Sequence, residues 1–264
     1  HRDLHSFPTR RSSDLYYEVA GIGPEILLVN GLGGDTRFWA PLVACLQKSF
    51  RVLVYDMRCA GRSDKPDAPF SIEDLAGEAH ELLRHTCRGK ACILGFSMGG
   101  MVAMKLAAGH PDCVRKLFLV ATAPSLRGPF PASEKTLSMF RRTDISEELL
   151  TEVYESLFGP GYREKVSARD FIDFRMSDEN PQPAFAYLRQ MEALESCDLR
   201  AEVENIHAPT SVIAGNEDKL IPPANADWLR GRSKDSTLHR FPGVGHMVPL
   251  EAAERLADIV TAEG

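Results

Sequence analysis

The chain has 264 residues, of which 44% are hydrophobic and 26% are charged, and its formal net charge is -6. This length and composition are typical of one globular domain, alone or with an inserted subdomain, and the acidic balance disfavours a nucleic-acid partner. No apolar run approaches the length that spans a bilayer, so no membrane association is expected.

The six cysteines are scattered along the chain without CxxC or paired spacing. In a chain of this length, such cysteines are typical of reduced thiols and not of a disulfide framework. We therefore expect a cytoplasmic protein. The cysteines are Cys45, Cys59, Cys87, Cys92, Cys113 and Cys197.

The first fifteen residues, His1 to Leu15, have no apolar periodicity, and the chain does not begin with Met. Their sequence, HRDLHSFPTRRSSDL, resembles the in-frame translation of a sequencing adapter over all fifteen positions. We interpret residues 1–15 as a non-native segment and exclude them from the fold. We expect this segment to be detached or irregular, to leave a sheet edge uncovered, and to stand where a truncated native N-terminus once lay.

From Tyr16 onward, short apolar runs alternate with stretches of helical periodicity, such as residues 38–46 and residues 72–83 with Ser71 as N-cap. Nearly continuous apolar runs indicate parallel strands that are covered on both faces, whereas the mixed last run favours a sheet edge. The alternation predicts an α/β fold with a doubly wound, mostly parallel sheet. The predicted strands are residues 26–29, 52–55, 92–94, 117–120, 211–214 and 237–241.

The sequence Gly95-Phe96-Ser97-Met98-Gly99 lies between a predicted strand and a predicted helix. This is the GxSxG pattern of a nucleophile elbow, in which the serine occupies a strained strand-to-helix turn. Glycines are needed on either side because side chains there would clash. Ser97 is therefore the predicted nucleophile, and a glycine-rich structural turn is the alternative.

Residues 124–197 contain no strand-like run, and proline and glycine separate their helical patterns. We interpret them as a helical cap inserted between two parts of an α/β core, residues 16–123 and 198–264. Most cap aromatics are expected to form the cap's own core. Arg141 and Arg142 could bind a substrate carboxylate, although solvated side chains are favoured. The predicted substrate-binding residues are Phe130, Phe140, Phe158 and Phe174.

The serine hydroxyl needs a base, and the base needs an acid to orient it. Among the eight histidines, His246 directly follows the last predicted strand, where small neighbours would leave its imidazole free to swing toward the serine. Asp218 follows the preceding strand and is the predicted acid, with Glu217 as its competitor. Asp56 also ends a strand, but its surroundings favour a structural turn. The order Ser97, Asp218, His246 along the chain is the nucleophile–acid–base order of hydrolases that carry a GxSxG nucleophile elbow.

The glycine-rich loop Asn30-Gly31-Leu32-Gly33-Gly34 follows the first apolar run. Such a loop exposes backbone N–H groups, which a tetrahedral oxyanion requires. The backbone amides of Leu32 and Met98 are the predicted oxyanion donors. A phosphate-binding loop is disfavoured because the lysine of the GxxxxGK[ST] pattern is missing.

Taken together, these motifs resemble the α/β-hydrolase superfamily from residue 16 to residue 260, and in particular the bacterial esterases and lactonases similar to 3-oxoadipate enol-lactonase. The resemblance is carried by NGLGGDTRFW, GFSMGGMVAM, APTSVIAGNEDKLIPP and FPGVGHMVPLEAAERL. It implies Ser97, Asp218 and His246 as the catalytic triad. It likewise implies Leu32 and Met98 as the oxyanion donors.

The sequence departs from the family pattern at two positions. Asn30 stands where the family usually has histidine, and asparagine can still tether the loop by hydrogen bonding. Cys59 stands where glycine is customary in the turn Arg58-Cys59-Ala60-Gly61-Arg62-Ser63, so the backbone conformation of this turn is left open.

The function predicted from the sequence is hydrolysis of a small-molecule carboxylic ester or lactone through an acyl-enzyme, without metal or cofactor. Carbon–carbon bond hydrolysis and cofactor-free perhydrolysis are the enzymatic alternatives on the same triad. A slowly hydrolysing small-molecule receptor is the alternative from another class. Homo-oligomer formation is left open.

Overall fold

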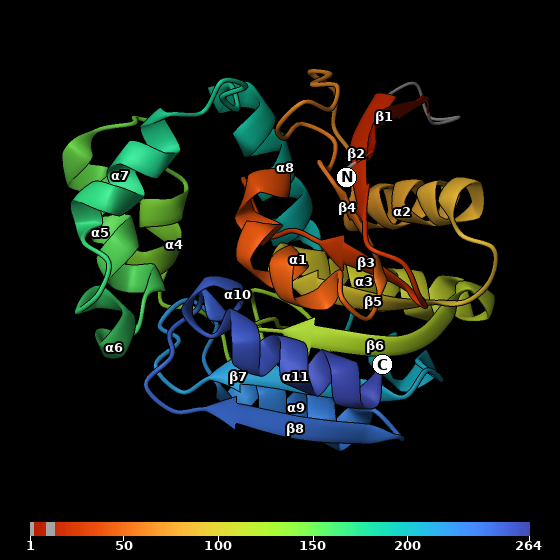
Figure 1. Cartoon of the computed structure of the whole chain (residues 1–264). Coiled ribbons are helices and arrows are strands. Elements are labelled where there is room, and N and C mark those ends of the chain that lie inside the picture. The colour runs from red at the N-terminus through yellow and green to blue at the C-terminus, as the bar shows by residue number, and fades with distance from the viewer. Residues whose placement is uncertain (1–2, 9–13) are drawn as a thin grey trace.

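A computed structural model describes residues 3–8 and 14–264 (Figure 1). In these ranges the strands form one eight-stranded sheet with the order β1-β2-β4-β3-β5-β6-β7-β8. The pairs β1–β2 and β2–β4 are antiparallel, and the other neighbours are parallel. The strands are β1 (Asp3–Pro8), β2 (Asp14–Ala20), β3 (Glu25–Val29), β4 (Arg51–Tyr55), β5 (Ala91–Phe96), β6 (Val114–Val120), β7 (Thr210–Gly215) and β8 (Ser236–Phe241).

Helices cover both faces of the sheet, which confirms the predicted doubly wound α/β architecture. On one face pack α1 (Ala40–Leu46) and α11 (Ala253–Glu263), and on the other pack α2 (Ile72–Thr86), α3 (Met98–Gly109) and α9 (Ala224–Arg232). The remaining short elements are η1 (Thr36–Trp39), η2 (Pro111–Cys113), η3 (Val203–Asn205) and α10 (Val248–Glu251).

The alternating side chains of β3 explain why its sequence is continuously apolar. Leu27 and Val29 belong to the core beneath α2 and α3, whereas Ile26 and Leu28 belong to the core beneath α1 and α11. Both sets are buried because both faces are covered. The mixed strand β8 lies at the sheet edge, as predicted. Ser71 caps α2 in a reciprocal capping box with Asp74, as its position before the helical pattern indicated.

Five α-helices lie between β6 and β7 and confirm the predicted helical insertion. Figure 1 shows α4 to α7 standing to one side of the sheet, with α8 leading back toward it. The predicted cap boundaries, 124 and 197, enclose all five. These helices are α4 (Glu134–Phe140), α5 (Glu147–Leu157), α6 (Pro160–Arg163), α7 (Ala168–Met176) and α8 (Ala184–Ser196).

The N-terminal segment differs from its prediction. Residues 3–8 form β1, which pairs with β2 from Asp3↔Val19 to Pro8↔Asp14, and Leu15 is fully buried. The expected detached or irregular conformation is therefore wrong for the described part of residues 1–15. Antiparallel pairing needs only backbone donors and acceptors, and the open edge of β2 supplies them whatever the side chains are. The resemblance to an adapter stays a prediction about the segment's origin.

Deletion of residues 1–13 tests the contribution of β1. We expect a lower melting temperature and more self-association, because the edge of β2 would become available to other chains. The hydrolytic activity expected from the sequence should be unchanged per folded molecule, because Ser97, Asp218 and His246 follow β5, β7 and β8 and not β1. Thermal melts, gel filtration and initial rates of the two proteins measure these effects. An unchanged melt and elution volume would show that β1 adds nothing to the fold.

The turn after β4 keeps a glycine-like backbone although cysteine replaces the customary glycine. Cys59 is fully buried and has a φ of 69°, in the left-handed region that glycine adopts most easily. Its N–H donates to the Asp64 carbonyl at 2.9 Å.

All six cysteines are free thiols, in agreement with the sequence prediction. In the described ranges, no helix has the length and apolar character that crossing a bilayer requires.

Candidate active site

Ser97 occupies a strained turn between β5 and α3. Its φ of 54° and ψ of -120° lie outside the helical and extended regions, and such strain persists only where surrounding contacts enforce it. Its N–H donates to the Val120 carbonyl at 2.9 Å, and its own carbonyl accepts the Thr122 hydroxyl at 2.7 Å. These bonds fix the turn against β6 and the segment after it, and they direct the serine side chain away from the sheet.

The two glycines of the GxSxG motif are required by close backbone packing. A Cβ at Gly95 would lie 2.3 Å from the Gly99 carbonyl oxygen, and one at Gly99 would lie 2.2 Å from the Val29 carbonyl oxygen. Neither backbone oxygen can move without disrupting the sheet or the helix. The steric argument made from the sequence is therefore confirmed.

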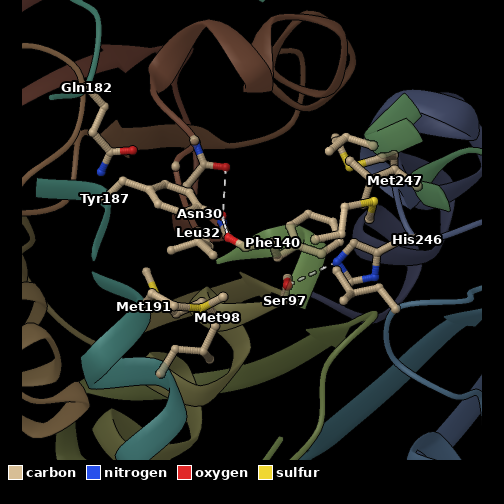
Figure 2. A pocket seen from close by; sticks show the side chains of 18 of the residues that line it. Asn30, Leu32, Ser97, Met98, Phe140, Gln182, Tyr187, Met191, His246 and Met247 are labelled. Atoms are coloured by element: carbon tan, nitrogen blue, oxygen red, sulfur yellow. Dashed lines mark hydrogen bonds between the residues drawn. The ribbon is translucent and has the colours of Figure 1, made fainter. Parts of the chain in front are cut away.

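The structure brings Ser97, His246 and Asp218 into one hydrogen-bonded chain. Ser97 Oγ lies 3.0 Å from His246 Nε2, as Figure 2 shows, and His246 Nδ1 lies 2.7 Å from Asp218 Oδ2. Asp218 Oδ1 accepts the N–H groups of Leu220 and Ile221 at 2.9 and 2.8 Å. His246 and Asp218 are 2% and 6% exposed, so water is largely excluded from this hydrogen bond and the electrostatic interactions there are screened weakly.

The competing acids predicted from the sequence lie in other environments. Glu217 is exposed, and its N–H donates to the Val244 carbonyl at 2.9 Å. Asp56 is buried and accepts the N–H groups of Thr36 and Arg62 at 2.7 and 2.8 Å, as a structural turn requires. Burial raises the pKa of Asp56 to about 6, although these two N–H donors oppose the shift.

His246 is held beside Ser97 by contacts of its backbone and of its ring. Its backbone N–H donates to the Leu157 carbonyl, at the end of α5, at 2.7 Å. Its ring is 5.1 Å from the Phe96 ring, centroid to centroid. Gly245, directly before it, is packed closely against the cap and β7: a Cβ on Gly245 would lie 2.6 Å from the Leu157 carbonyl oxygen, and a Cβ on Gly215 would lie 2.1 Å from the Gly245 carbonyl oxygen.

The glycine-rich loop after β3 lies against the serine. A Cβ on Gly31 would approach Ser97 Cβ to 3.2 Å. Asn30 tethers the loop as expected, because its side-chain amide donates to the Asp35 carbonyl at 2.6 Å and its Oδ1 accepts the Gly31 N–H at 3.2 Å. Asn30 thus provides the tether in the position where the family usually has histidine.

Both predicted oxyanion donors line the same cavity as Ser97 (Figure 2). Met98 is the first residue of α3, so its N–H has no acceptor within the helix. Leu32 lies in the turn that the Gly34 N–H closes on the Gly31 carbonyl at 3.2 Å. The two amides are therefore placed beside the serine, and their role in binding an oxyanion stays a prediction.

Gln190 supports this loop and was missed by the sequence analysis. It is fully buried on α8 in the cap; its Oε1 accepts the Gly33 N–H at 3.1 Å, and its Nε2 donates to the Arg58 carbonyl at 2.8 Å. The cap therefore contacts the glycine-rich loop through this side-chain amide, and also through Arg175 in α7, whose guanidinium donates to the Gly33 carbonyl at 3.3 Å. No motif marks this residue, because a glutamine on an amphipathic helix is ordinarily solvated.

An apolar cavity of roughly 270 Å³ lies above Ser97 and beneath the cap. Of the four predicted substrate-binding aromatics, Phe140 and Phe174 line it. Phe158 instead packs inside the cap, stacked on Tyr162 with ring centroids 4.8 Å apart, and Phe130 is 43% exposed. An apolar pattern in the cap predicts that a side chain is buried, but it does not show whether that side chain faces the interior of the cap or the cavity. Methionines also line the cavity: Met98, Met101, Met139, Met191 and Met247.

A family model of the alpha/beta hydrolase fold matches residues 24–253. The chain belongs to the α/β-hydrolase fold family. It is 33% identical over 242 residues to a protein of Variovorax paradoxus provisionally named carbamate hydrolase RutD, covering 88% of this chain and 89% of that one. It is 26% identical to the pimeloyl acyl-carrier-protein methyl ester esterase of Nitrosomonas europaea, covering 95% of this chain and 99% of the esterase.

Among solved structures, the enol-lactonase from Burkholderia xenovorans LB400 matches this α/β hydrolase with a TM-score of 0.83 and 28% identity, covering 98% of both chains. The family and fold predicted from the sequence are thus confirmed. The relatives' names refer to a carbamate, a methyl ester and an enol-lactone, so membership of the family establishes a hydrolase without specifying its substrate.

Proposed function

We propose that this α/β hydrolase cleaves a carboxylic ester or lactone through an acyl-enzyme formed on Ser97. The observation that carries the proposal is the hydrogen-bonded chain Ser97–His246–Asp218 at the base of an apolar cavity. The relatives named as a methyl ester esterase and an enol-lactonase support the choice of bond.

In the first step, Ser97 Oγ attacks the substrate carbonyl carbon while His246 Nε2 takes the hydroxyl proton. Asp218 holds the ring through Nδ1 and stabilises the imidazolium. The N–H groups of Leu32 and Met98 bind the oxyanion of the tetrahedral intermediate. The carbonyl re-forms as the alkoxide leaves, and His246 returns the proton to that alkoxide. The acyl group remains on Ser97, and in a lactone it still carries the released hydroxyl.

In the second step, a water molecule attacks the acyl-enzyme with His246 as the base. The water oxygen forms the new bond to the carbonyl carbon. The bond from that carbon to Ser97 Oγ then breaks, and His246 protonates the serine. The products are a carboxylic acid and the alcohol released earlier, or, from a lactone, a single hydroxy acid. Every proton is returned, so the enzyme regains its starting state.

The cavity lining favours a substrate with an apolar part of moderate size. Leucines, methionines and phenylalanines surround the space above Ser97, and methionine side chains adapt easily to different shapes. Steady-state hydrolysis of p-nitrophenyl acetate, butyrate and octanoate, together with a lactone and a carbamate, tests the proposal. We expect multiple turnovers and a higher kcat/KM for butyrate than for acetate. Release of a single equivalent followed by a stall would instead indicate a receptor.

Arg141 and Arg142 are not expected to recognise a substrate carboxylate. Arg141 pairs with Glu134 and Glu195 at 2.7 and 2.6 Å, and Arg142 pairs with Asp144 at 2.6 Å, so both charges are already compensated. In the double variant Arg141→Ala/Arg142→Ala, the ratio of kcat/KM for neutral over carboxylate-bearing esters should match that of the wild type. A shift of this ratio by an order of magnitude would show that the two arginines bind the substrate carboxylate.

A further inference from the structure

The end of cap helix α5 and the loop that carries His246 are joined by direct backbone packing. A Cβ on Gly159 would lie 2.3 Å from the Gly243 carbonyl oxygen, and a Cβ on Gly245 would lie 2.6 Å from the Leu157 carbonyl oxygen. Side chains are excluded from this junction on both sides. Apolar side chains pack beside the junction, where Met247 and Leu250 lie against the cluster of Tyr154, Leu157 and Phe158, but at the glycines themselves the two segments meet backbone to backbone.

A single carboxylate spans the junction. Glu251 Oε2 accepts the Gly159 N–H at 2.8 Å, on the cap side. Both of its oxygens lie 3.1 Å from the Gly245 nitrogen, one residue before His246. The His246 N–H itself donates to the Leu157 carbonyl at 2.7 Å. The backbone that leads into His246 is thus held to the cap, directly at the His246 N–H and through Glu251 at the Gly245 N–H.

The position of Glu251 makes it a rigid anchor. It is the last residue of α10, and its own N–H donates to the Met247 carbonyl at 2.9 Å. Figure 1 shows α10 beside the base of the cap. The carboxylate is partly buried, and burial raises its pKa while the N–H groups of Gly245 and Gly159 oppose the shift. Glycine N–H groups in such a setting need an acceptor, and a charged acceptor gives the stronger bond.

We propose that Glu251 is a positioning residue for catalysis, which orients His246 by fastening its loop to the end of α5. The proposal rests on the proposed function, in which His246 is the base. Its consequence is that the position of the cap on the core determines the geometry of the triad as well as the shape of the substrate pocket. A displaced cap would turn the imidazole away from Ser97 even with the triad residues intact.

Loss of the hydrogen bonds from Gly245 and Gly159 to Glu251 is expected to lower kcat more than it changes KM. In the described part of the chain, Glu251 is not among the residues that line the cavity, so its removal deletes no contact with the substrate. A displacement of the imidazole of about 1 Å costs on the order of 10²-fold in rate. We therefore expect Glu251→Ala to lower kcat by about 10- to 100-fold, with KM changed by less than about threefold.

The experiment compares Glu251→Ala, Glu251→Gln and Glu263→Ala. Glu263, in α11, is the matched control: it accepts the Ser211 hydroxyl and pairs with Lys116 at 3.2 Å and His239 at 2.8 Å, away from the cavity. Active sites are counted by saturating fluorophosphonate labelling, and kcat is expressed per labelled serine. Glu251→Gln should retain part of the rate, because its one carbonyl oxygen can still accept a glycine N–H. Glu263→Ala should keep the wild-type kcat per site.

A purely structural role would lower the melting temperature and the number of labelled sites while kcat per site stayed unchanged. That result in Glu251→Ala would overturn the proposal, as would a kcat per site in Glu251→Gln no higher than in Glu251→Ala. The downfield proton resonance of the His246–Asp218 hydrogen bond gives a readout that needs no substrate. We expect it to broaden or shift in Glu251→Ala and to stay in place in Glu263→Ala. An unchanged resonance in Glu251→Ala contradicts the proposal, whereas absence of ester turnover in the wild type refutes only the proposed function.

Discussion

Replacement of Ser97 with alanine is expected to reduce ester hydrolysis by about 10⁶-fold, as loss of the nucleophile does in other triad hydrolases. Ser97 Oγ lies 3.0 Å from the base and faces the cavity, so the substitution removes the attacking atom and little else. The backbone bonds that fix the turn, from the Ser97 N–H to Val120 and from Thr122 to the Ser97 carbonyl, do not involve the hydroxyl. The melting temperature should therefore stay close to that of the wild type.

Initial rates with a p-nitrophenyl ester, together with a thermal melt, measure this effect. The rates need a background correction, because traces of wild-type enzyme would exceed the residual activity of the variant. Retention of more than a tenth of the wild-type kcat in folded Ser97→Ala protein would contradict the assignment of the nucleophile.

Asp218→Asn should lower kcat by about 10⁴-fold, the loss found when the acid of a triad becomes an amide. Asp218 Oδ2 lies 2.7 Å from His246 Nδ1, and an amide there removes the compensating charge and favours the wrong tautomer. The N–H groups of Leu220 and Ile221 donate to Oδ1, which an asparagine carbonyl can replace. The loop should therefore keep its conformation, and KM should change little.

Glu217→Gln is the matched control, since it removes a carboxylate from the neighbouring, exposed position. Its kcat should equal that of the wild type. A larger loss in Glu217→Gln than in Asp218→Asn would show that the neighbouring carboxylate orients the base. Measurement of kcat and KM for both variants at one pH separates the two outcomes.

The core of the fold could be predicted from the sequence, and the three positions of the proposed triad could be selected, because each has a local signal. Strands buried on both faces give continuous apolar runs, as in residues 26–29 and 117–120, which became β3 and β6. The glycines around Ser97 are required by backbone contacts below 2.5 Å, so the sequence itself carries the steric requirement. Asp218 and His246 directly follow strands that end at the same edge of the sheet as β5.

Features that depend on tertiary contacts could not be predicted. The strand β1 forms through backbone pairing with β2, which no side-chain pattern records. Phe140 and Phe158 are both aromatic residues at the C-terminal ends of cap helices, yet only the first of these two lines the cavity. Gln190 and Glu251 bond to backbone groups more than 90 residues away in sequence, and such partners are set by the packed cap.

The most direct test of the proposed mechanism is peptide mapping by mass spectrometry after inactivation with a fluorophosphonate. The mechanism predicts a single phosphonyl adduct on Ser97, with turnover lost in proportion to its occupancy and no adduct in Ser97→Ala. An adduct on another residue that accounts for the inactivation, or full ester turnover with Ser97 modified, would contradict it.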